Sequence, residues 1–150
     1  MNRKSGWIVC ALLVAVGFFF MGGVFSESGA GETRALKVYP IGKIVKKAGR
    51  TLIVIDKQFE AGLLRVDRLS HLTVLYWLDR NDTPEKRSIL QVHPRGNVDN
   101  PLTGVFATHS PVRPNLIGVS RCKIISVNGN IIEIDEIDAF DGSPVIDLKS

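Results

Sequence analysis

Residues 123–135, KIISVNGNIIEID, predict a β-hairpin near the end of the chain. The segments KIISV and IIEID are rich in β-branched residues, and they flank the pair Asn128-Gly129. An Asn-Gly pair in this position favours the positive φ angles of a type I′ turn, which joins two antiparallel strands. The stretch therefore indicates a fold in which strands pair with their neighbours along the chain.

Segments on both sides of the hairpin also read as strands. Residues 36–56 form two extended segments around KKAGR, where Gly49 marks the turn. Residues 73–79 (TVLYWLD) are typical of a strand buried on both faces. Further strands are predicted at 88–93 (SILQVH), at 104–110 (GVFATHS) and after the Asp-Gly turn of 141–150 (DGSPVIDLKS). Short strands separated by short turns predict a mostly β fold, a small antiparallel or mixed β-barrel.

Helix is predicted at one place in the domain. Residues 57–72 (KQFEAGLLRVDRLSHL) are the best helical candidate, and Gly62 also allows two short turns there. Residues 80–87 (RNDTPEKR) read as a loop. Residues 94–115 cannot form a long helix or a continuous central strand, because they contain Pro94, Pro101, Pro111 and Pro114.

Length and charge bound the kind of domain. Without its apolar leader the chain has about 120 residues, enough for one domain with a modest core. From residue 31 onward, 17 basic and 14 acidic residues leave a net charge of about +3. A mildly basic domain is compatible with a phosphate-bearing partner without requiring one.

The first 30 residues have the three-part layout of an export signal. Arg3 and Lys4 precede an uncharged run at 7–25, and small polar residues follow it. The run is long enough to span a bilayer as a hydrophobic helix, so an uncleaved anchor and a signal cleaved after Ala30 both remain open. Either alternative keeps the N-terminus in the cytoplasm and places the domain outside. Residues 31–38 then form a linker, and residues 39–150 form the domain.

No pattern for a metal centre or a hydrolytic triad is present in the sequence. His71, His93 and His109 lack metal-ligand spacing, and no serine lies in a Gly-x-Ser-x-Gly elbow. Cys122 is the one cysteine of the domain, so it reads as a small buried residue on a strand. We therefore expect no metal.

The segment EIDEIDAFDG at 133–142 carries three aspartates at a spacing of three, Asp135, Asp138 and Asp141. They either gather around one mouth or form a solvated turn in which Asp141 bonds its own backbone. Counter-charges are available in the proline-rich stretch from Arg95, His109 and Arg113. Carboxylates facing arginines suit a zwitterionic or cationic cofactor beside a phosphate-rich substrate.

Two longer motifs carry a resemblance. GVFATHSPVRPNLIG at 104–118 is similar to the pattern G-V-F-A-T-R-S-x-x-R-P-N-P-I-G, and DGSPVIDLKS is similar to D-G-T-P-V-x-D-I-K-P-Y. LSHLTVLYWLD at 69–79 and VHPRG at 92–96 match as well. These patterns belong to the TsaA-like, or TrmO, family of S-adenosylmethionine-dependent methyltransferases, and the resemblance extends from Tyr39 to Lys149.

The resemblance implies a small β-barrel, usually a homodimer, that needs no metal. It implies S-adenosyl-L-methionine as the cofactor and N6 of threonylcarbamoyladenosine at position 37 of tRNA as the methyl acceptor. It places cofactor contacts at Asp79, Arg80, His109, Val119, Asp135, Glu136, Ile137 and Asp138. Arg113 and Asn115, which match the R-P-N core, are the candidate catalytic or substrate-facing residues.

The chain also departs from the family pattern. His109 replaces an arginine, Leu116 replaces a proline, and the sequence ends at Ser150 where the pattern continues. These departures favour an alternative function, an exported binding module with a degraded cofactor site and no catalysis. A start downstream of the leader would instead give a cytoplasmic enzyme, although no methionine follows Met21.

Overall fold

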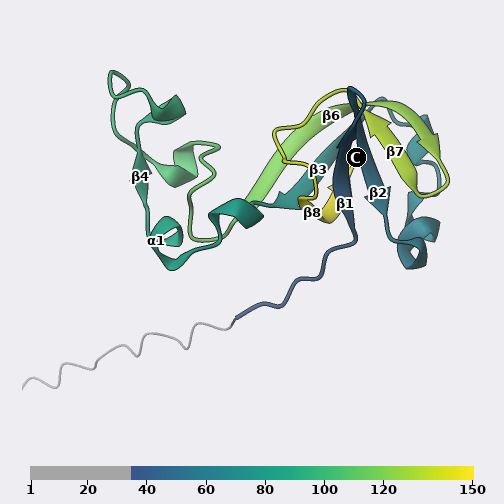
Figure 1. Cartoon of the computed structure of the whole chain (residues 1–150), viewed down its shortest axis with the longest axis horizontal. Coiled ribbons are helices and arrows are strands. Elements are labelled where there is room, and N and C mark those ends of the chain that lie inside the picture. Colours follow the sequence, from purple (N-terminus) through teal and green to yellow (C-terminus); the bar gives the residue numbers. More distant parts are fainter. Residues whose placement is uncertain (1–34) are drawn as a thin grey trace, which may run out of the picture. The chain divides into compact units, whose positions relative to one another are not determined.

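The structure, a computed structural model, describes residues 35–150, so the predicted leader lies outside the described residues. Six strands close an antiparallel barrel in the order β1-β2-β7-β6-β3-β8 (Figure 1). Their bounds are β1 Gly42–Lys47, β2 Arg50–Ile55, β3 His71–Trp77, β6 Ile117–Asn128, β7 Ile131–Ile134 and β8 Pro144–Lys149. The predicted barrel is confirmed, and its strand pairs are all antiparallel rather than mixed.

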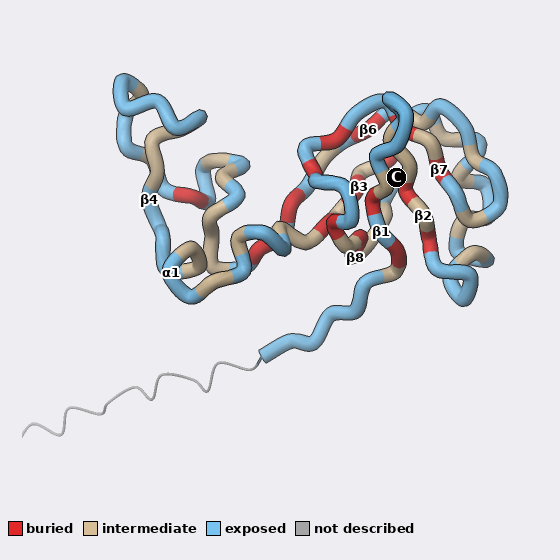
Figure 2. The backbone as a smooth tube through the Cα atoms, in the orientation of Figure 1, coloured by how far each residue is buried: buried red, intermediate tan, exposed pale blue. Residues whose placement is uncertain are grey.

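The core fills the inside of this barrel. Fully buried aliphatic side chains come from every strand of the barrel but β6, among them Ile44, Ile53, Val74, Ile132 and Val145. Figure 2 shows buried residues on the barrel strands, and further ones in the excursion and in the loop before β8. β6 contributes Cys122, which is fully buried as predicted. Burial disfavours the thiolate and raises the pKa of Cys122 to about 11.

Burial on β3 follows a strict alternation, so the prediction that residues 73–79 are buried on both faces is wrong. Leu72, Val74 and Tyr76 are buried. Leu75 and Trp77, which point to the opposite face of the strand, are partly exposed. The physical reason is that a strand of a small closed barrel has one face in the core and the other face outside.

The predicted hairpin at 123–135 is confirmed, but its turn lies one residue later than expected. Asn128 pairs with Ile131, which leaves Gly129 and Asn130 as the two-residue loop. Gly129 has φ 58° and Asn130 has no positive φ, as in a type II′ turn rather than the predicted type I′. Asn130 exchanges hydrogen bonds with Ile55 of β2, which fixes the loop in this register.

The turn between β1 and β2 has the conformation that the sequence suggested for the other hairpin. Both central residues have positive φ, 51° at Ala48 and 74° at Gly49, as a type I′ turn requires. We expect Ala48→Asn to stabilise the fold by about 1 kcal/mol, because alanine is strained in the left-handed region and asparagine tolerates it. Urea unfolding measures this, with Ala61→Asn as the control at an exposed alanine without positive φ. An unchanged midpoint for Ala48→Asn would contradict the expectation.

Between β3 and β6 the chain leaves the barrel and returns to it (Figure 1). We call residues 78–116 the excursion. Its elements are η3 Asp79–Asn81, α1 Pro84–Arg87, β4 Gln91–Val92, η4 Pro94–Gly96, β5 Thr103–Gly104 and η5 Val105–Ala107. As predicted, residues 94–115 form neither a long helix nor a central strand.

Three local predictions fail in the excursion. The predicted strand at 88–93 shrinks to β4, because Ser88 still caps α1. The predicted strand at 104–110 stops after Gly104, where a short 3-10 turn lets Val105 become fully buried. The predicted loop at 80–87 contains α1, whose first turn is capped by the Thr83 hydroxyl, which accepts a hydrogen bond from the Lys86 amide at 3.3 Å.

The helical candidate at 57–72 forms two short turns, the second of the two options that the sequence allowed. These are the 3-10 helices η1 Lys57–Leu63 and η2 Val66–Arg68. They are separated at Arg65, which has φ 70°, and β3 begins at His71. Among residues 35–150, no helix reaches the length and apolarity that a membrane crossing needs.

Candidate functional site

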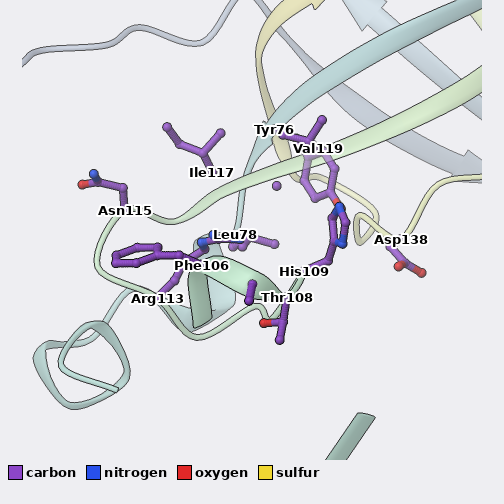
Figure 3. Close-up of a pocket in the computed structure, with 12 residues that line it drawn as sticks. Tyr76, Leu78, Phe106, Thr108, His109, Arg113, Asn115, Ile117, Val119 and Asp138 are labelled. Carbon is purple, nitrogen blue, oxygen red and sulfur yellow. The ribbon is translucent and has the colours of Figure 1, made fainter. Parts of the chain in front are cut away.

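A groove of about 750 Å³ opens where the ends of β3 and β6 meet the excursion and the loop before β8. We call it the barrel groove. Leu78, Ile117 and Val119 give it apolar walls, and polar groups come from both sides (Figure 3). The register pair Trp77↔Ile117 brings the two strand ends together, which positions the excursion across them.

Five residues singled out in the sequence line this groove. They come from different segments of the chain, and they are His109, Arg113, Asn115, Val119 and Asp138. In Figure 3, His109 and Asp138 lie toward one end of the groove, and Arg113 and Asn115 lie toward the other. A carboxylate and a guanidinium thus share one groove with an apolar wall.

The other predicted cofactor residues lie around this groove rather than in it. Arg80 lines a smaller adjoining cavity, together with His109 and Asp138. Glu136 and Ile137 line a separate, polar cavity that also reaches Asp138.

Two predicted cofactor residues are engaged in the fold. The Asp79 carboxylate accepts a hydrogen bond from the buried Ser143 hydroxyl at 3.2 Å. The Asp135 carboxylate accepts hydrogen bonds from the Lys123 amide at 2.9 Å and the Glu136 amide at 2.8 Å. The backbone bonds to the Asp135 carboxylate hold its pKa below the ordinary value.

The carboxylates of Asp135, Asp138 and Asp141 do not line one common cavity. Asp138 lines the groove, whereas Asp135 faces backbone amides of its own strand pair. Asp141 is exposed in a turn, as the solvated-turn alternative predicted, but its carboxylate accepts a hydrogen bond from the Lys46 amide of β1 at 2.7 Å instead of one from its own backbone.

Further contacts fix the loop that carries Asp138. The Lys46 ammonium donates to the Ile137 carbonyl at 2.8 Å, and the Arg80 guanidinium lies 3.9 Å from the centre of the Phe140 ring. Asp138 itself stays exposed between these two anchors. Its position is therefore set by neighbours, and its carboxylate is free to face a ligand.

Tyr76, which the sequence did not single out, lies at the floor of the groove. Burial raises the pKa of Tyr76 above its ordinary value. The hydrogen bond with the Ser120 hydroxyl at 3.4 Å lowers this pKa by less, and the negative charge of Asp138 raises it slightly. Tyr76 therefore keeps its proton and presents a neutral hydroxyl. Tyr76 could have been found from the sequence, because it follows Leu72 and Val74 at every second position. This spacing places all three on the buried face of β3, but only if the strand is recognised as buried on one face.

A clamp holds the Arg113–Asn115 segment from the side of α1. The Arg87 guanidinium donates to the Asp82 carboxylate at 2.8 Å and to the Pro114 carbonyl at 2.8 Å. The Trp77 indole donates to the same carboxylate at 3.2 Å. Hydrogen bonds from Arg87 and Trp77 lower the pKa of Asp82, so its contribution to the clamp is present at neutral pH and lost as pH falls through that lowered value.

We expect Arg87→Met to loosen this segment without unfolding the barrel. Losing the bond to the Pro114 carbonyl costs about 1 kcal/mol, which corresponds to an exchange rate roughly fivefold faster. The reporter is the Leu78 amide, which donates to the Leu116 carbonyl at 2.9 Å, and hydrogen exchange followed by NMR measures it. Lys57→Met, which removes an exposed ion pair with Glu60 outside the excursion, is the control. Unchanged exchange at Leu78 would show that Arg87 clamps nothing.

Comparison with known proteins identifies the family. The sequence profile of the tRNA-methyltransferase O N-terminal domain, TrmO_N, matches residues 33–150. The chain belongs to the TrmO family. A probable S-adenosyl-L-methionine-binding protein of Methanocaldococcus jannaschii is 46% identical over 110 residues, which are 73% of this chain and 87% of that protein.

Larger proteins match over part of their length. A tRNA (adenine(37)-N6)-methyltransferase of Mus musculus is 36% identical over 90 residues, 60% of this chain and 20% of that protein. The crystal structure of TrmO from P. aeruginosa superimposes with a TM-score of 0.59 at 26% identity, covering 79% of this chain and 55% of that one. The chain thus spans about half the length of the solved TrmO structure.

The two substitutions within the TrmO motif at 104–118 occupy different environments. Leu116, where the family has proline, is fully buried, and its carbonyl binds the Leu78 amide at the end of β3. His109, where the family has arginine, is exposed in the groove. The first departure therefore affects packing, and the second affects the groove itself.

Proposed function

We propose that this protein binds S-adenosyl-L-methionine in the barrel groove and transfers its methyl group to an acceptor. The acceptor that the family resemblance suggests is N6 of threonylcarbamoyladenosine at position 37 of tRNA. One observation carries the proposal, the convergence in a single groove of His109, Arg113, Asn115, Val119 and Asp138.

The groove suits this cofactor by size and by chemistry. Its volume of about 750 Å³ lies within the range of small-molecule sites. Leu78, Ile117 and Val119 offer an apolar wall to a flat ring. Asp138 would accept hydrogen bonds from amino or hydroxyl groups of the cofactor, and Arg113 would bind its carboxylate.

When bound, S-adenosyl-L-methionine would supply a methyl group on a sulfonium. An in-line nucleophile would take this methyl group as the carbon–sulfur bond breaks, and the sulfur would leave as a neutral thioether. The chain contributes binding and orientation, which supply much of the rate in reactions of this kind. Tyr76 keeps a neutral hydroxyl at the groove floor, and the Arg87 clamp fixes the segment that presents Arg113 and Asn115.

Titration calorimetry of the full-length chain with S-adenosyl-L-methionine tests the cofactor. We expect saturable binding of one molecule per chain, and much weaker binding of ATP, which shares the adenosine but lacks the sulfonium and the amino acid. Absence of saturable heat at millimolar cofactor would sink the proposal. Transfer of a labelled methyl group to tRNA that carries unmethylated threonylcarbamoyladenosine tests the acceptor separately.

A second candidate function is a non-catalytic binding module with a degraded cofactor site, and His109 is the observation that favours it. Arginine offers a permanent charge and a two-pronged donor that histidine lacks. His109→Arg separates the two candidates in the same calorimetric titration. Cofactor affinity that appears only in His109→Arg supports the module, whereas equal affinity in both chains supports the methyltransferase.

We also propose that residues 7–25 carry the domain across a membrane, as an anchor or as a cleaved signal. The support is the charge and length pattern of the sequence, with Arg3 and Lys4 before the apolar run. A reporter fused to the C-terminus should be found outside the cytoplasm. A cytoplasmic reporter would contradict export.

A homodimer is proposed from the family resemblance. Leu90 and Leu102 of the excursion are each 57% exposed, and pairing with a second copy would remove such side chains from water. Sedimentation equilibrium should give twice the 16.5 kDa of one chain. A mass of 16.5 kDa at micromolar concentration would contradict the dimer.

A further inference from the structure

A second groove, of about 1040 Å³, lies within the excursion and reaches the barrel groove. We call it the loop groove. Ile89, Val92, Val98 and Pro111 give it broad apolar walls, and Arg95 is the arginine that lines it. The function proposed above assigns no ligand to it.

The two grooves meet at a shared set of residues. Ala107, Thr108, His109 and Asp138 line both of them. Methyl transfer requires the donor and the acceptor to approach within about 3 to 3.5 Å in line, so the acceptor must enter a space that adjoins the cofactor. The loop groove is such a space, because it shares one end with the barrel groove.

The loop that carries Arg95 is held in a strained conformation. Arg95 and Gly96 both have positive φ, 60° and 66°, and a non-glycine residue in this region costs about 1 kcal/mol or more. The loop is closed by hydrogen bonds from the Gly96 amide to the His93 carbonyl at 3.0 Å and from the Asn100 side-chain amide to the Pro94 carbonyl at 2.9 Å. The fold therefore fixes where the Arg95 side chain emerges.

The charge of Arg95 is available to a ligand. Its side chain is exposed, and no ion pair within residues 35–150 engages it. A guanidinium beside apolar walls suits an RNA strand, because arginine binds phosphates and its plane also stacks on bases. An acidic peptide would have little use for the apolar walls.

We propose that the loop groove binds the RNA strand that carries the methyl acceptor, and that Arg95 binds one of its phosphates. The proposal rests on the proposed function, because it takes the barrel groove as the site of the methyl donor. The reacting groups then meet at His109 and Asp138, where the two grooves join.

The assignment is tested by measuring the binding of tRNA to the full-length chain with fluorescence anisotropy. The titration is repeated at salt concentrations from about 50 to about 200 mM, which gives the slope of log affinity against log salt. The probe is tRNA that carries unmethylated threonylcarbamoyladenosine. Arg95→Asn removes the charge while keeping a residue that tolerates positive φ. The matched control is Arg65→Asn, because Arg65 is an exposed arginine with φ 70° outside both grooves.

We expect Arg95→Asn to weaken tRNA binding by roughly tenfold and to reduce the slope of log affinity against log salt by about 0.7 to 0.9, the value for one lost phosphate contact. Arg65→Asn should change neither quantity, and the affinity for S-adenosyl-L-methionine should be the same in all three chains. Equal tRNA affinity and slope in Arg95→Asn and the parent chain would overturn the assignment, as would no tRNA binding by the parent chain. Failure of the parent chain to bind S-adenosyl-L-methionine would overturn the proposed function instead, so the two failures are told apart.

Discussion

Gly42→Ala should destabilise the barrel by about 3 kcal/mol or more, at the upper end of the range for overpacking in a core. A Cβ atom at this position would lie 2.3 Å from the Val54 carbonyl oxygen and 2.8 Å from the Cα atom of Ile55. Both neighbours are backbone atoms of β2, so no change of side-chain rotamer can relieve the contact. The two strands would have to separate.

The place of Gly42 in the barrel makes this separation expensive. Gly42 pairs with Ile55 on one side and with Val145 on the other, at the seam between β1 and β8, where the Ile41 amide donates to the Val145 carbonyl at 2.8 Å. This short seam closes the barrel, so moving β1 away from β2 also strains the closure. A loss of 3 kcal/mol is a large share of the 5–15 kcal/mol that typically stabilises a domain, as an order of magnitude.

Thermal unfolding followed by circular dichroism measures the effect, which we expect to lower the melting temperature by on the order of 10 °C or more. Gly62→Ala is the matched control, because a Cβ there would meet no atom within 4 Å. That control should change the melting temperature little. Equal melting temperatures for the two variants would contradict the close packing at the seam.

Asp138→Asn should lower the affinity for S-adenosyl-L-methionine by about 10- to 100-fold while leaving the fold intact. The carboxylate lies in the barrel groove and is exposed, so replacing it by an amide of the same shape removes a charge and little packing. Hydrogen bonds to charged groups are worth about 1.5–3 kcal/mol, and each 1.4 kcal/mol is about tenfold in affinity.

Calorimetric titration of the variant and the parent chain gives the ratio of dissociation constants. Asp67→Asn serves as the control, because Asp67 is an exposed carboxylate on η2 and lines neither groove. A dissociation constant for Asp138→Asn within twofold of the parent value would remove Asp138 from the cofactor site. A matching loss in Asp67→Asn would point to a general effect of charge.

The barrel was predictable because short stretches of sequence mark the turns of its hairpins. Gly49 and the Asn128-Gly129 pair marked turns between β-branched segments, and these segments pair in the structure. The exact turn type was not predictable in this way, because contacts of Asn130 with a third strand shift the loop by one residue. Local sequence therefore predicts which segments pair, and the neighbouring strand decides the register of the turn.

The excursion was harder to predict because its short elements depend on single contacts. Thr83 and Pro84 were a usable signal for α1, since threonine caps helices and proline favours their first turn. The neighbouring residues gave no sign that Val105 would be buried in a 3-10 turn, which ends the predicted strand at Gly104. The burial of one valine there outweighs the strand preference of its neighbours.

Residue patterns alone could not select the candidate site. Spacing gave Asp135, Asp138 and Asp141 equal weight, whereas in the structure backbone amides occupy two of them and leave Asp138 in the groove. The family resemblance narrowed this choice in part, because it excluded Asp141 but kept Asp135 beside Asp138. Neither the residue spacing nor the family motifs pointed to Tyr76, which also lines the groove.

The register pair Trp77↔Ile117 has a consequence for how such proteins diversify. The excursion leaves and re-enters the barrel at two residues that face each other across adjacent strands, so its two ends are pinned at a fixed separation. Sequence change between them leaves the strand pairs of the barrel untouched. An excursion transplanted from a relative at these two points should therefore fold on this barrel, while the groove wall formed by β3 and β6 stays the same.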